Sequence, residues 1–328
     1  MRVLVTGSSG FVGRHVVREL KDRHELFTPT SQELNLLDAS RIQCGCCLED
    51  TAVDNIARFL LNNHIDAIIH LAATCGGIGI NKENPGQFIY DNLQMGINVL
   101  EAARIAGTKK IVNLGTVCSY PKFAPIPFQE KDIYNGYPEE TNAPYGIAKR
   151  TVMEMGIAYA SQYGMNITNL IPVNMAGEFD NFNLHSSHVI PAMVRKFENP
   201  DVDTAGTYGI SFKYPAKYVT LWGNGSASRE FLYAGDCAKA IALSLEKDTG
   251  PDPINIGTGQ EITIKNLAEA IKKIGNYDAN IVWELSKPNG QPRRCLDVSR
   301  AEKVLGWKAE TSLEDMVART IEWFRKTK

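Results

Sequence analysis

Short apolar runs alternate with stretches of helical periodicity over about the first 170 residues of the chain. Short apolar runs bounded by turn residues are typical of buried strands, and apolar residues that recur every three or four positions are typical of helices. The pattern predicts strands at Val3–Thr6, Glu25–Phe27, Ala67–Leu71, Lys110–Leu114 and Asn166–Ile171. It predicts helices at Val12–Asp22, Val53–Asn62, Pro85–Gly107 and Ala143–Tyr163. This alternation favours an α/β fold with a doubly wound parallel sheet.

The pattern changes after Pro172, where polar stretches and stretches rich in glycine and proline separate shorter elements. Strands are predicted at Tyr218–Trp222 and Ile254–Ile256, and helices at Ala234–Glu246, Ile264–Gly275 and Leu313–Lys326. We therefore expect a Rossmann-type domain over residues 1–172 and a smaller C-terminal α/β lobe over residues 173–328. Part of residues 229–260 is expected to return to the first domain.

Composition narrows the classes of partner. The chain has 328 residues, 44% of them apolar, which suffices for one domain and a smaller lobe. Its 35 basic and 37 acidic residues give a net charge of −2 without a long basic run, which argues against nucleic acid and anionic membranes as partners. No apolar run reaches the roughly 18 residues of a membrane span, and no signal-peptide pattern precedes the first strand. We expect a cytoplasmic protein.

Seven cysteines are scattered along the chain, at positions 44, 46, 47, 75, 118, 237 and 295. An odd, dispersed set in a chain of this size indicates reduced thiols rather than a disulfide framework. Cys44-Gly45-Cys46-Cys47 contains one C-x-x-C spacing, and no second such pair follows. A zinc or redox site is one interpretation of this cluster; the favoured one is a loop with incidental thiols and no metal.

A glycine-rich turn, Gly7-Ser8-Ser9-Gly10-Phe11-Val12-Gly13, joins the first predicted strand to the first predicted helix. Such a turn lets backbone N–H groups approach a pyrophosphate, and the helix dipole favours an anion there. Glycine patterns also occur in tight strand–helix turns that bind nothing. The position of this one, in the first strand–helix unit, favours a dinucleotide site.

Tyr145 and Lys149 lie four residues apart in a predicted helix and therefore on one of its faces. The ammonium can lower the pKa of the phenol, and the phenol can act as the acid that protonates an alkoxide. A solvated surface pair is the alternative interpretation. Together with the glycine turn, the pair indicates hydride chemistry on a carbonyl or an alcohol.

Other candidate groups follow strand ends, which meet at one edge of a parallel sheet. If the chain stays extended after Lys110–Leu114, Thr116 and Cys118 point to the same side and face one pocket. The alternative for Cys118 is a buried packing role. His188 lies in a polar loop before a helix; opposite Cys118 it would complete a base and acid couple, although a single histidine is more often structural.

These motifs resemble those of the extended short-chain dehydrogenases/reductases, within the group of nucleotide-sugar epimerases and dehydratases. The resemblance runs nearly end to end, and its Cys-x-Tyr-Pro and Ser-His-Val-Ile-Pro segments are far more specific than the Tyr/Lys pair. The other segments that carry it include Glu33-Leu34-Asn35-Leu36-Leu37-Asp38, Cys75-Gly76-Gly77-Ile78, Thr141-Asn142-Ala143-Pro144-Tyr145, Arg229-Glu230-Phe231 and Asn255-Ile256-Gly257-Thr258-Gly259.

The resemblance implies an enzyme that epimerises C3 and C5 of a GDP-4-keto-6-deoxy-hexose and reduces its C4 ketone. The implied reaction converts GDP-4-keto-6-deoxy-D-mannose to GDP-L-fucose or a close analogue. The resemblance also implies NADP as the cofactor, with NAD as the alternative, and a homodimer built from the helices at Pro85–Gly107 and Ala143–Tyr163.

The resemblance assigns site residues as well. It makes Thr116 the hydroxyl partner of the catalytic Tyr145/Lys149 pair, and Cys118 and His188 the epimerisation base and acid. The implied cofactor-binding residues are Gly7, Ser8, Ser9, Gly10, Phe11, Val12, Gly13, Ser31, Asp38, Leu71, Ala72, Ala73, Leu114, Gly115, Tyr145, Lys149, Pro172, Asn174, Met175 and His188. The implied contacts to the GDP-sugar are Asn174, Lys196, Trp222, Arg229 and Arg294.

Four features depart from the pattern of the family. Ser9 and Ser31 stand where it carries basic residues, and arginine is the natural partner of a ribose 2′-phosphate. No carboxylate ends the second strand. The segment Met175-Ala176-Gly177-Glu178 replaces a usual Tyr-Gly-Pro, and Ile42–Val53 is longer than usual. The two serines predict weak discrimination between NADPH and NADH, with NADPH modestly preferred through the Thr30 and Ser31 hydroxyls.

Two other functions stay open. One is a 4-ketoreductase, or an epimerase without net reduction, that acts on a different GDP-sugar; intact Cys118 and His188 argue against the pure reductase. The other is a non-catalytic dinucleotide-binding protein, against which the complete Tyr145/Lys149 pair argues.

Overall fold

The computed structural model describes residues 1–37, 51–203, 216–287 and 289–327. The cluster of Cys44, Cys46 and Cys47, like the predicted cofactor residue Asp38, lies outside the described residues. None of the described helices combines the length and apolar character that crossing a membrane requires.

Six parallel strands form the main sheet, in the order β10-β5-β4-β3-β1-β2. Their bounds are β1 Arg2–Thr6, β2 Glu25–Phe27, β3 Ala67–His70, β4 Lys110–Leu114, β5 Asn166–Pro172 and β10 Ile254–Ile256. The four central strands are almost wholly buried, as expected of a sheet with helices on both faces. The strand order reverses direction beside β1, where β2 lies on one side and β3 on the other, and ligands bind at such a point.

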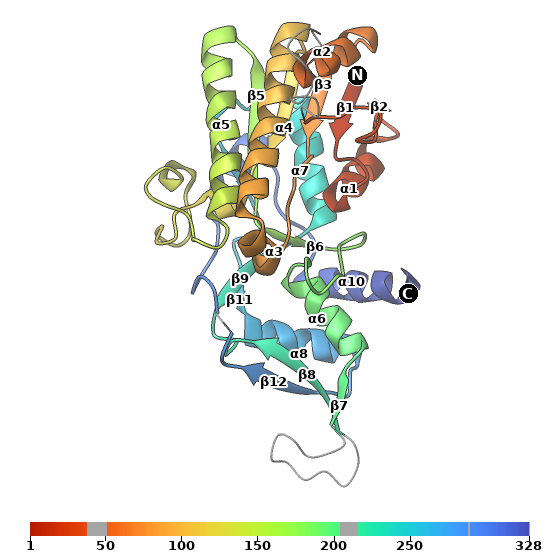
Figure 1. Ribbon diagram of the computed structural model, residues 1–328, viewed down its shortest axis with the longest axis vertical. Coiled ribbons are helices and arrows are strands. Elements are labelled where there is room, and N and C mark those ends of the chain that lie inside the picture. Colours follow the sequence, from red (N-terminus) through yellow and green to blue (C-terminus); the bar gives the residue numbers. More distant parts are fainter. Residues whose placement is uncertain (38–50, 204–215, 288, 328) are drawn as a thin grey trace, which may run out of the picture.

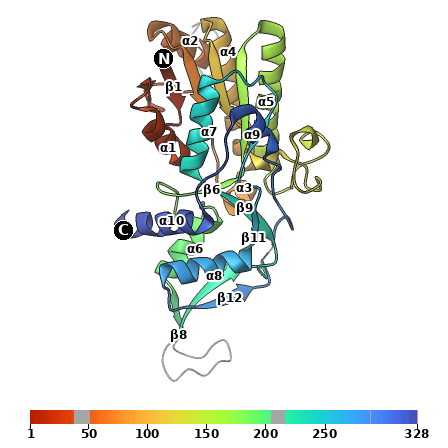
Figure 2. The same ribbon diagram turned by 180° about the vertical axis from the view of Figure 1, so that it is seen from behind.

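Helices cover both faces of this sheet (Figures 1 and 2). One face carries α2 Ala52–Asn62, α4 Pro85–Ala106 and α5 Ala143–Tyr163, and the other carries α1 Phe11–Leu20 and α7 Ala234–Glu246. Separate hydrophobic clusters fill the two interfaces, with Val16 and Ile241 in one and Ile56 and Val99 in the other. The predicted doubly wound α/β fold is confirmed.

The C-terminal part holds two small sheets, ordered β11-β9-β6 and β12-β8-β7, which lie below the main sheet in Figure 1. The strands are β6 Asn174–Ala176, β7 Asp201–Asp203, β8 Ala216–Trp222, β9 Ser228–Tyr233, β11 Glu261–Thr263 and β12 Asn280–Glu284. The helices are α6 Val189–Glu198, α8 Ile264–Gly275 and α10 Leu313–Thr327. These elements have their own hydrophobic core, a third cluster that includes Phe197, Leu221 and Leu267.

Two short helices and two 3₁₀ turns are the remaining described elements. They are α3 Ile78–Glu83, α9 Ser299–Leu305 and the 3₁₀ turns η1 Val117–Ser119 and η2 Glu130–Asp132. From within residues 229–260, α7 packs on α1 and β10 joins the main sheet beside β5. The chain thus crosses to the C-terminal part after β5 and returns to the main sheet through α7 and β10.

Candidate active site

The glycine turn leads from β1 into α1, and two of its glycines are required by close approach. Gly7 has a φ of +69°, and a Cβ there would lie 2.8 Å from the backbone nitrogen of Ala72. A Cβ on Gly13 would overlap the carbonyl oxygen of Gly7. The turn therefore folds tightly against both β3 and the first turn of α1, with Gly10 as the N-cap. A pyrophosphate suits this arrangement, because the glycines let an anion approach the backbone N–H groups at the start of the helix.

The exit of β3 is fixed to the same edge. The backbone N–H groups of Leu71 and Ala72 each donate to Thr6 Oγ1 at 3.2 Å, and Thr6 Oγ1 lies 2.9 Å from His70 Nδ1. Burial lowers the pKa of His70 to about 3, so its ring is neutral. His70 is a structural residue that holds the exit of β3, and Ala73 follows at the mouth of the site.

The chain turns at Cys118 instead of staying extended, so the expected reason for placing Thr116 and Cys118 in one pocket was wrong. Thr116 is extended, with φ −155° and ψ 145°, but η1 begins at the next residue. Thr116 Oγ1 accepts a hydrogen bond of 3.2 Å from the backbone N–H of Cys118. The same hydroxyl hydrogen-bonds with the Tyr145 phenol. The turn, rather than a strand, brings the backbone of Cys118 to the Thr116 hydroxyl.

Tyr145 and Lys149 lie on α5, where their electrostatics differ from the expectation. Burial raises the pKa of Tyr145 well above its usual value, the charges of Cys75 and Cys118 add to this, and the hydrogen bond with Thr116 opposes it. Lys149 is not among these influences; burial lowers the pKa of its own ammonium to about 8. A phenol that keeps its proton at neutral pH is suited to donate it.

Cys118 packs directly on α5 because Gly146 has no side chain. A Cβ at Gly146 would overlap the carbonyl oxygen of Cys118, and Ser119 Oγ donates to the Gly146 carbonyl at 2.9 Å. From the C-terminal part, Arg294 Nη1 donates to Cys118 Sγ at 3.6 Å. Gly146, which sequence reasoning passed over, therefore sets the distance between thiol and phenol.

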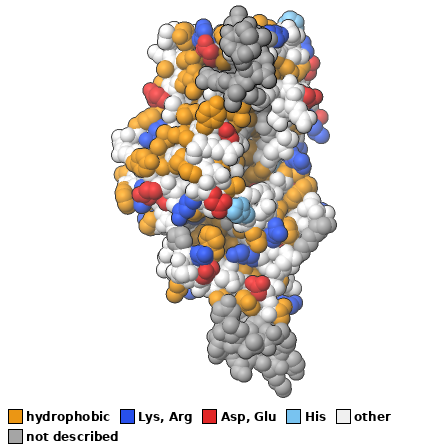
Figure 3. Space-filling model, viewed as in Figure 1, with side chains coloured by type: hydrophobic (Ala, Val, Ile, Leu, Met, Phe, Trp, Pro, Cys, Tyr) orange, Lys and Arg blue, Asp and Glu red, His pale blue; other side chains and the backbone are white. Residues whose placement is uncertain are grey.

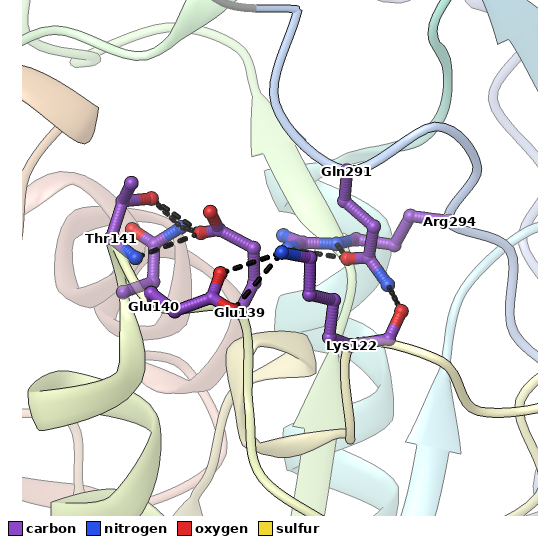
Figure 4. A network of polar contacts seen from close by, with 7 residues as sticks. Lys122, Glu139, Glu140, Thr141, Gln291 and Arg294 are labelled. Carbon is purple, nitrogen blue, oxygen red and sulfur yellow. Dashed lines mark hydrogen bonds and ion pairs between the residues drawn. The ribbon is translucent and has the colours of Figure 1, made fainter.

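The guanidinium of Arg294 is fixed from its other side. Gln291 Oε1 accepts from Arg294 Nε at 3.2 Å and from Nη2 at 3.0 Å, and Gln291 Nε2 donates to the carbonyl of Lys122 at 2.7 Å. Figure 4 shows this pair beside the ion pair of Lys122 with Glu140. Arg294 is buried, and its remaining nitrogen faces the thiol.

The segment Cys75–Gly77 joins this centre to the loop before α6. Asn81 Nδ2 donates to the carbonyls of Gly76 and Gly77 at 2.8 and 2.9 Å, and the N–H of Gly77 donates to the carbonyl of Ser186 at 3.0 Å. Loss of surrounding water raises the pKa of the Cys75 thiol, and the Lys149 charge opposes this shift. Sequence reasoning gave Cys75 no role.

His188 follows the residues that pack on Gly76 and Gly77, and it is the N-cap of α6. Its edge stays accessible, while the protein around the ring lowers its pKa by desolvation. Among the described residues, no hydrogen bond or ion pair joins His188 to Tyr145 or Cys118, so its role as the epimerisation acid stays a prediction; a neutral imidazole can exchange a proton.

The predicted sugar contacts spread over the C-terminal part. Trp222 ends β8 with half of its surface exposed, and Lys196 Nζ donates to the carbonyl of Thr220 at 2.7 Å. Arg229 lies on β9; burial lowers the pKa of its guanidinium to about 10, and the charge of Arg294 adds to this. Lys196 and Trp222 share no described hydrogen bond or ion pair with the Tyr145 centre. Arg229 lies close enough to Arg294 and Cys118 for their charges to shift the pKa of its guanidinium.

Glu230 fixes the strand that carries Arg229. Its carboxylate is fully buried and accepts from the backbone N–H groups of Gly259 at 2.8 Å and Leu296 at 2.7 Å. The carbonyl of Glu230 accepts from Asn174 Nδ2 at 3.0 Å. One buried carboxylate thus ties β9 to the segment after Cys295 and to the loop after β10.

The remaining predicted cofactor residues lie at strand ends on one edge of the main sheet. Leu114 ends β4, Gly115 follows it, Pro172 ends β5, and Asn174 and Met175 open β6. Ser31 lies in the turn after β2, where the Thr30 hydroxyl donates to the Glu33 carboxylate at 2.9 Å. A glycine turn, a phenol, a thiol and two arginines lie toward that edge, and these groups are suited to proton and hydride transfer on an anionic, carbonyl-bearing ligand.

Comparison with known proteins agrees with this chemistry. The NAD dependent epimerase/dehydratase family matches residues 3–257. The chain is 36% identical to the GDP-L-fucose synthase of Escherichia coli (strain K12) over 98% of this chain and 96% of that protein. It is 34% identical to the GDP-L-colitose synthase of Yersinia pseudotuberculosis over 100% of this chain and 99% of that protein.

A solved structure is similar over the full length. The GDP-mannoheptose C4 reductase from Campylobacter jejuni, solved with NADP bound, superposes with a TM-score of 0.82 at 28% identity. The superposition covers 99% of this chain and 98% of that one. The resemblance inferred from the motifs is confirmed at the level of the family.

Proposed function

Because this chain belongs to the NAD dependent epimerase/dehydratase family, we propose that it epimerises and reduces a GDP-4-keto-6-deoxy-hexose, with GDP-L-fucose or a close analogue as the product. The observation that carries this proposal is that Thr116 Oγ1 accepts from the backbone N–H of Cys118 and hydrogen-bonds with the Tyr145 phenol, on which the charge of Cys118 also acts. A reductase needs the phenol, whereas the thiol adds a base for epimerisation.

Epimerisation begins at a hydrogen that the C4 ketone makes acidic. Cys118 removes the proton from C3 or C5, and the Arg294 guanidinium at 3.6 Å stabilises negative charge on the sulfur. Thr116 and Tyr145 donate to the enolate oxygen that develops at C4. His188 returns a proton to the opposite face of the ring.

Reduction uses the same phenol. NADPH, when bound, supplies the hydride that reaches C4. Tyr145 protonates the alkoxide, and its raised pKa means that the proton is present at neutral pH. Lys149 contributes positive charge from the same face of α5 up to a pH of about 8. The glycine turn would hold the pyrophosphate of the cofactor.

The test is to incubate the protein with GDP-4-keto-6-deoxy-D-mannose and NADPH, to follow absorbance at the nicotinamide band and to identify the product by NMR. Conversion to a sugar inverted at C3 and C5 and reduced at C4 supports the proposal. Reduction without inversion would assign a GDP-sugar 4-ketoreductase instead, and an unchanged ketone with intact NADPH would overturn both.

The cofactor preference is expected to be modest. Ser9 and Ser31 carry no charge, and the Thr30 hydroxyl already donates to Glu33, so it is not free to donate to a phosphate. Losing a charge-assisted contact weakens binding about tenfold to a hundredfold. Titration with NADPH and NADH is expected to show less than a hundredfold preference for NADPH; a larger preference for either cofactor contradicts this expectation.

We also propose a homodimer, a cytoplasmic location and a division of labour between the two parts of the chain. The exposed apolar residues of α4 and α5 suit a two-fold interface. The described cysteines are free thiols, which suits a reducing compartment. Residues 1–172, with α7 and β10, would hold the dinucleotide, and most of residues 173–328 the sugar nucleotide.

A further inference from the structure

Arg14 extends from the first turn of α1 back toward the glycine turn. Its Nε donates to the carbonyl of Ser9 at 3.0 Å, and its side chain is exposed. The guanidinium lies over the ring of Phe179, 5.4 Å from the centroid. Within the described ranges no carboxylate forms an ion pair with Arg14, so the two terminal nitrogens stay available to an anion.

Phe179 forms a rigid support for this arginine. Its φ is +68°, a conformation that a residue with a side chain keeps only when its surroundings hold it. Trp323 of α10 packs on its ring at 4.5 Å and His15 of α1 at 5.2 Å, between centroids. The carbonyl of the preceding Glu178 accepts from His15 Nε2 at 3.0 Å. The guanidinium is thus held between a fixed ring and the backbone of the glycine turn.

The residues of the glycine turn and of the turn after β2 provide no positive charge for a ribose 2′-phosphate, and Arg14 could provide it. A ribose 2′-phosphate carries close to two negative charges and calls for a cationic partner. The glycine turn itself offers Ser8 and Ser9, which are neutral, and the turn after β2 carries the Glu33 carboxylate. Hydrogen bonds from Thr30 lower the pKa of Glu33, so this group is ionised and would repel a phosphate.

We propose that Arg14 binds the 2′-phosphate of NADPH with its terminal nitrogens and so determines the cofactor preference. This inference rests on the proposed function for its choice of ligand. Nε remains on the Ser9 carbonyl, which orients the planar guanidinium so that Nη1 and Nη2 can bind two phosphate oxygens together. Arg14 of α1 would thus supply the positive charge that Ser9 does not supply in the glycine turn.

The experiment measures binding, without turnover. Dissociation constants for NADPH, NADH, 2′,5′-ADP and 5′-AMP are determined by calorimetry for the native protein and for Arg14→Gln. The variant is expected to bind NADPH and 2′,5′-ADP about tenfold more weakly, and NADH and 5′-AMP within threefold of the native protein. The difference between 2′,5′-ADP and 5′-AMP isolates the 2′-phosphate.

Arg18→Gln is the matched control. Arg18 lies one turn further along α1 and also covers the Phe179 ring, at 4.8 Å, but its Nη1 pairs with Glu178 at 3.9 Å. The control is expected to leave the ratio of the two affinities unchanged. Equal losses for NADPH and NADH in Arg14→Gln, no loss at all, or the same selective loss in Arg18→Gln would overturn the inference.

These outcomes are separate from those that test the proposed function. If Arg14→Gln leaves the preference unchanged while the protein still converts the GDP-sugar, only the inference fails. If the variant loses NADPH selectively and the native protein converts no GDP-4-keto sugar, the role of Arg14 stands and the proposed function fails.

Discussion

At the scale of residues, the proposed base Cys118 and the proposed acid Tyr145 both hydrogen-bond with one hydroxyl, that of Thr116, Cys118 through its backbone N–H and Tyr145 through its phenol. Cys118 also receives the Arg294 guanidinium, while Tyr145 holds its proton through burial. Base and acid can therefore be removed one at a time, with different consequences for the two half-reactions.

Cys118→Ser is expected to abolish most deuterium incorporation at C3 and C5 when the ketone substrate is incubated in D₂O. A serine hydroxyl is far less acidic than a thiol, whose usual pKa is about 8.5. Hydride transfer to an unepimerised ketone persists because Tyr145 and Lys149 are unchanged. NMR of the recovered sugar gives the exchange, and NADPH absorbance gives the reduction.

Tyr145→Phe provides the reciprocal control for this prediction. It removes the proton donor for the C4 alkoxide, so reduction is lost, while exchange at C3 and C5 continues at a lower rate because Thr116 still donates to the enolate oxygen. If Cys118→Ser exchanges deuterium at the native rate, Cys118 is a packing residue and another group is the base.

Asp180 predicts a pH-dependent change in stability. Burial raises the pKa of its carboxyl to about 7, against the opposing hydrogen bond from the N–H of Asn181 at 2.7 Å. Its usual pKa is about 3.9. The native state therefore holds a proton that the unfolded chain releases, and stability falls as the pH rises from about 4 to about 7. Asparagine cannot ionise, so it escapes this loss.

The free energy of unfolding of Asp180→Asn, relative to the native protein, is expected to be about 2–3 kcal/mol higher at pH 8 than at pH 5. Urea unfolding at the two pH values measures it, and Asp278→Asn, at an exposed site, is the control. A difference between variant and native protein that is equal at both pH values would show that Asp180 does not titrate in this window.

At the scale of elements, the close packing of η1 on α5 positions the thiol, and Gly146 permits it. A methyl group there would overlap the Cys118 carbonyl oxygen and lie 2.8 Å from the carbonyl carbon. Gly146→Ala is expected to cost about 1–3 kcal/mol of stability, as overpacking does, and to lower both exchange and reduction because Cys118 moves away from Tyr145. Thermal unfolding and the NMR assay measure the two effects.

Gly86→Ala, in α4, is the matched control. A Cβ at Gly86 meets no atom within 4 Å, so alanine is expected to leave stability unchanged or slightly raised and both activities intact. If Gly146→Ala behaves like Gly86→Ala, the contact between η1 and α5 does not set the geometry of the centre.

The elements of the main sheet could be predicted from the sequence because each has a clear apolar pattern. Glu25–Phe27, Lys110–Leu114 and Ala143–Tyr163 have the predicted bounds. The strands β6, β7, β9, β11 and β12 were missed, because short or mixed strands that pair inside a small lobe carry no regular alternation. Their formation depends on partners distant in the sequence, such as β6 beside β9.

The candidate site was predictable to a similar degree. The glycine turn and the Tyr145/Lys149 pair have fixed spacings that can be read directly. Cys75 and Asp180 belong to no motif of fixed spacing, because their surroundings arise from tertiary packing alone. Gly146 carried a signal: a glycine beside the tyrosine inside a helix costs stability and therefore calls for a close neighbour.

At the scale of the whole molecule, one helical face bears several exposed hydrophobic side chains among the residues that the structure describes. Tyr90, Ile97 and Ile105 of α4 and Tyr163 of α5 are each exposed by more than a third of their surface. Figure 3 shows hydrophobic side chains spread over the side of the molecule that carries these helices. The two helices pack closely on each other, because a Cβ at Gly96 would overlap Val152, so the face is continuous. Apolar helical faces of this kind pair across two-fold axes.

The final prediction concerns this face. Light scattering at micromolar concentration is expected to give twice the chain mass of 36.2 kDa for the native protein. Ile97→Glu places a charge at the centre of the proposed interface, where burial without a partner is unfavourable, and is expected to give a monomer. Leu285→Glu, at a site 73% exposed after β12, is the control and should remain dimeric. A native monomer, or a dimer that survives Ile97→Glu, would show that α4 and α5 do not form the interface; in the second case another surface joins the chains.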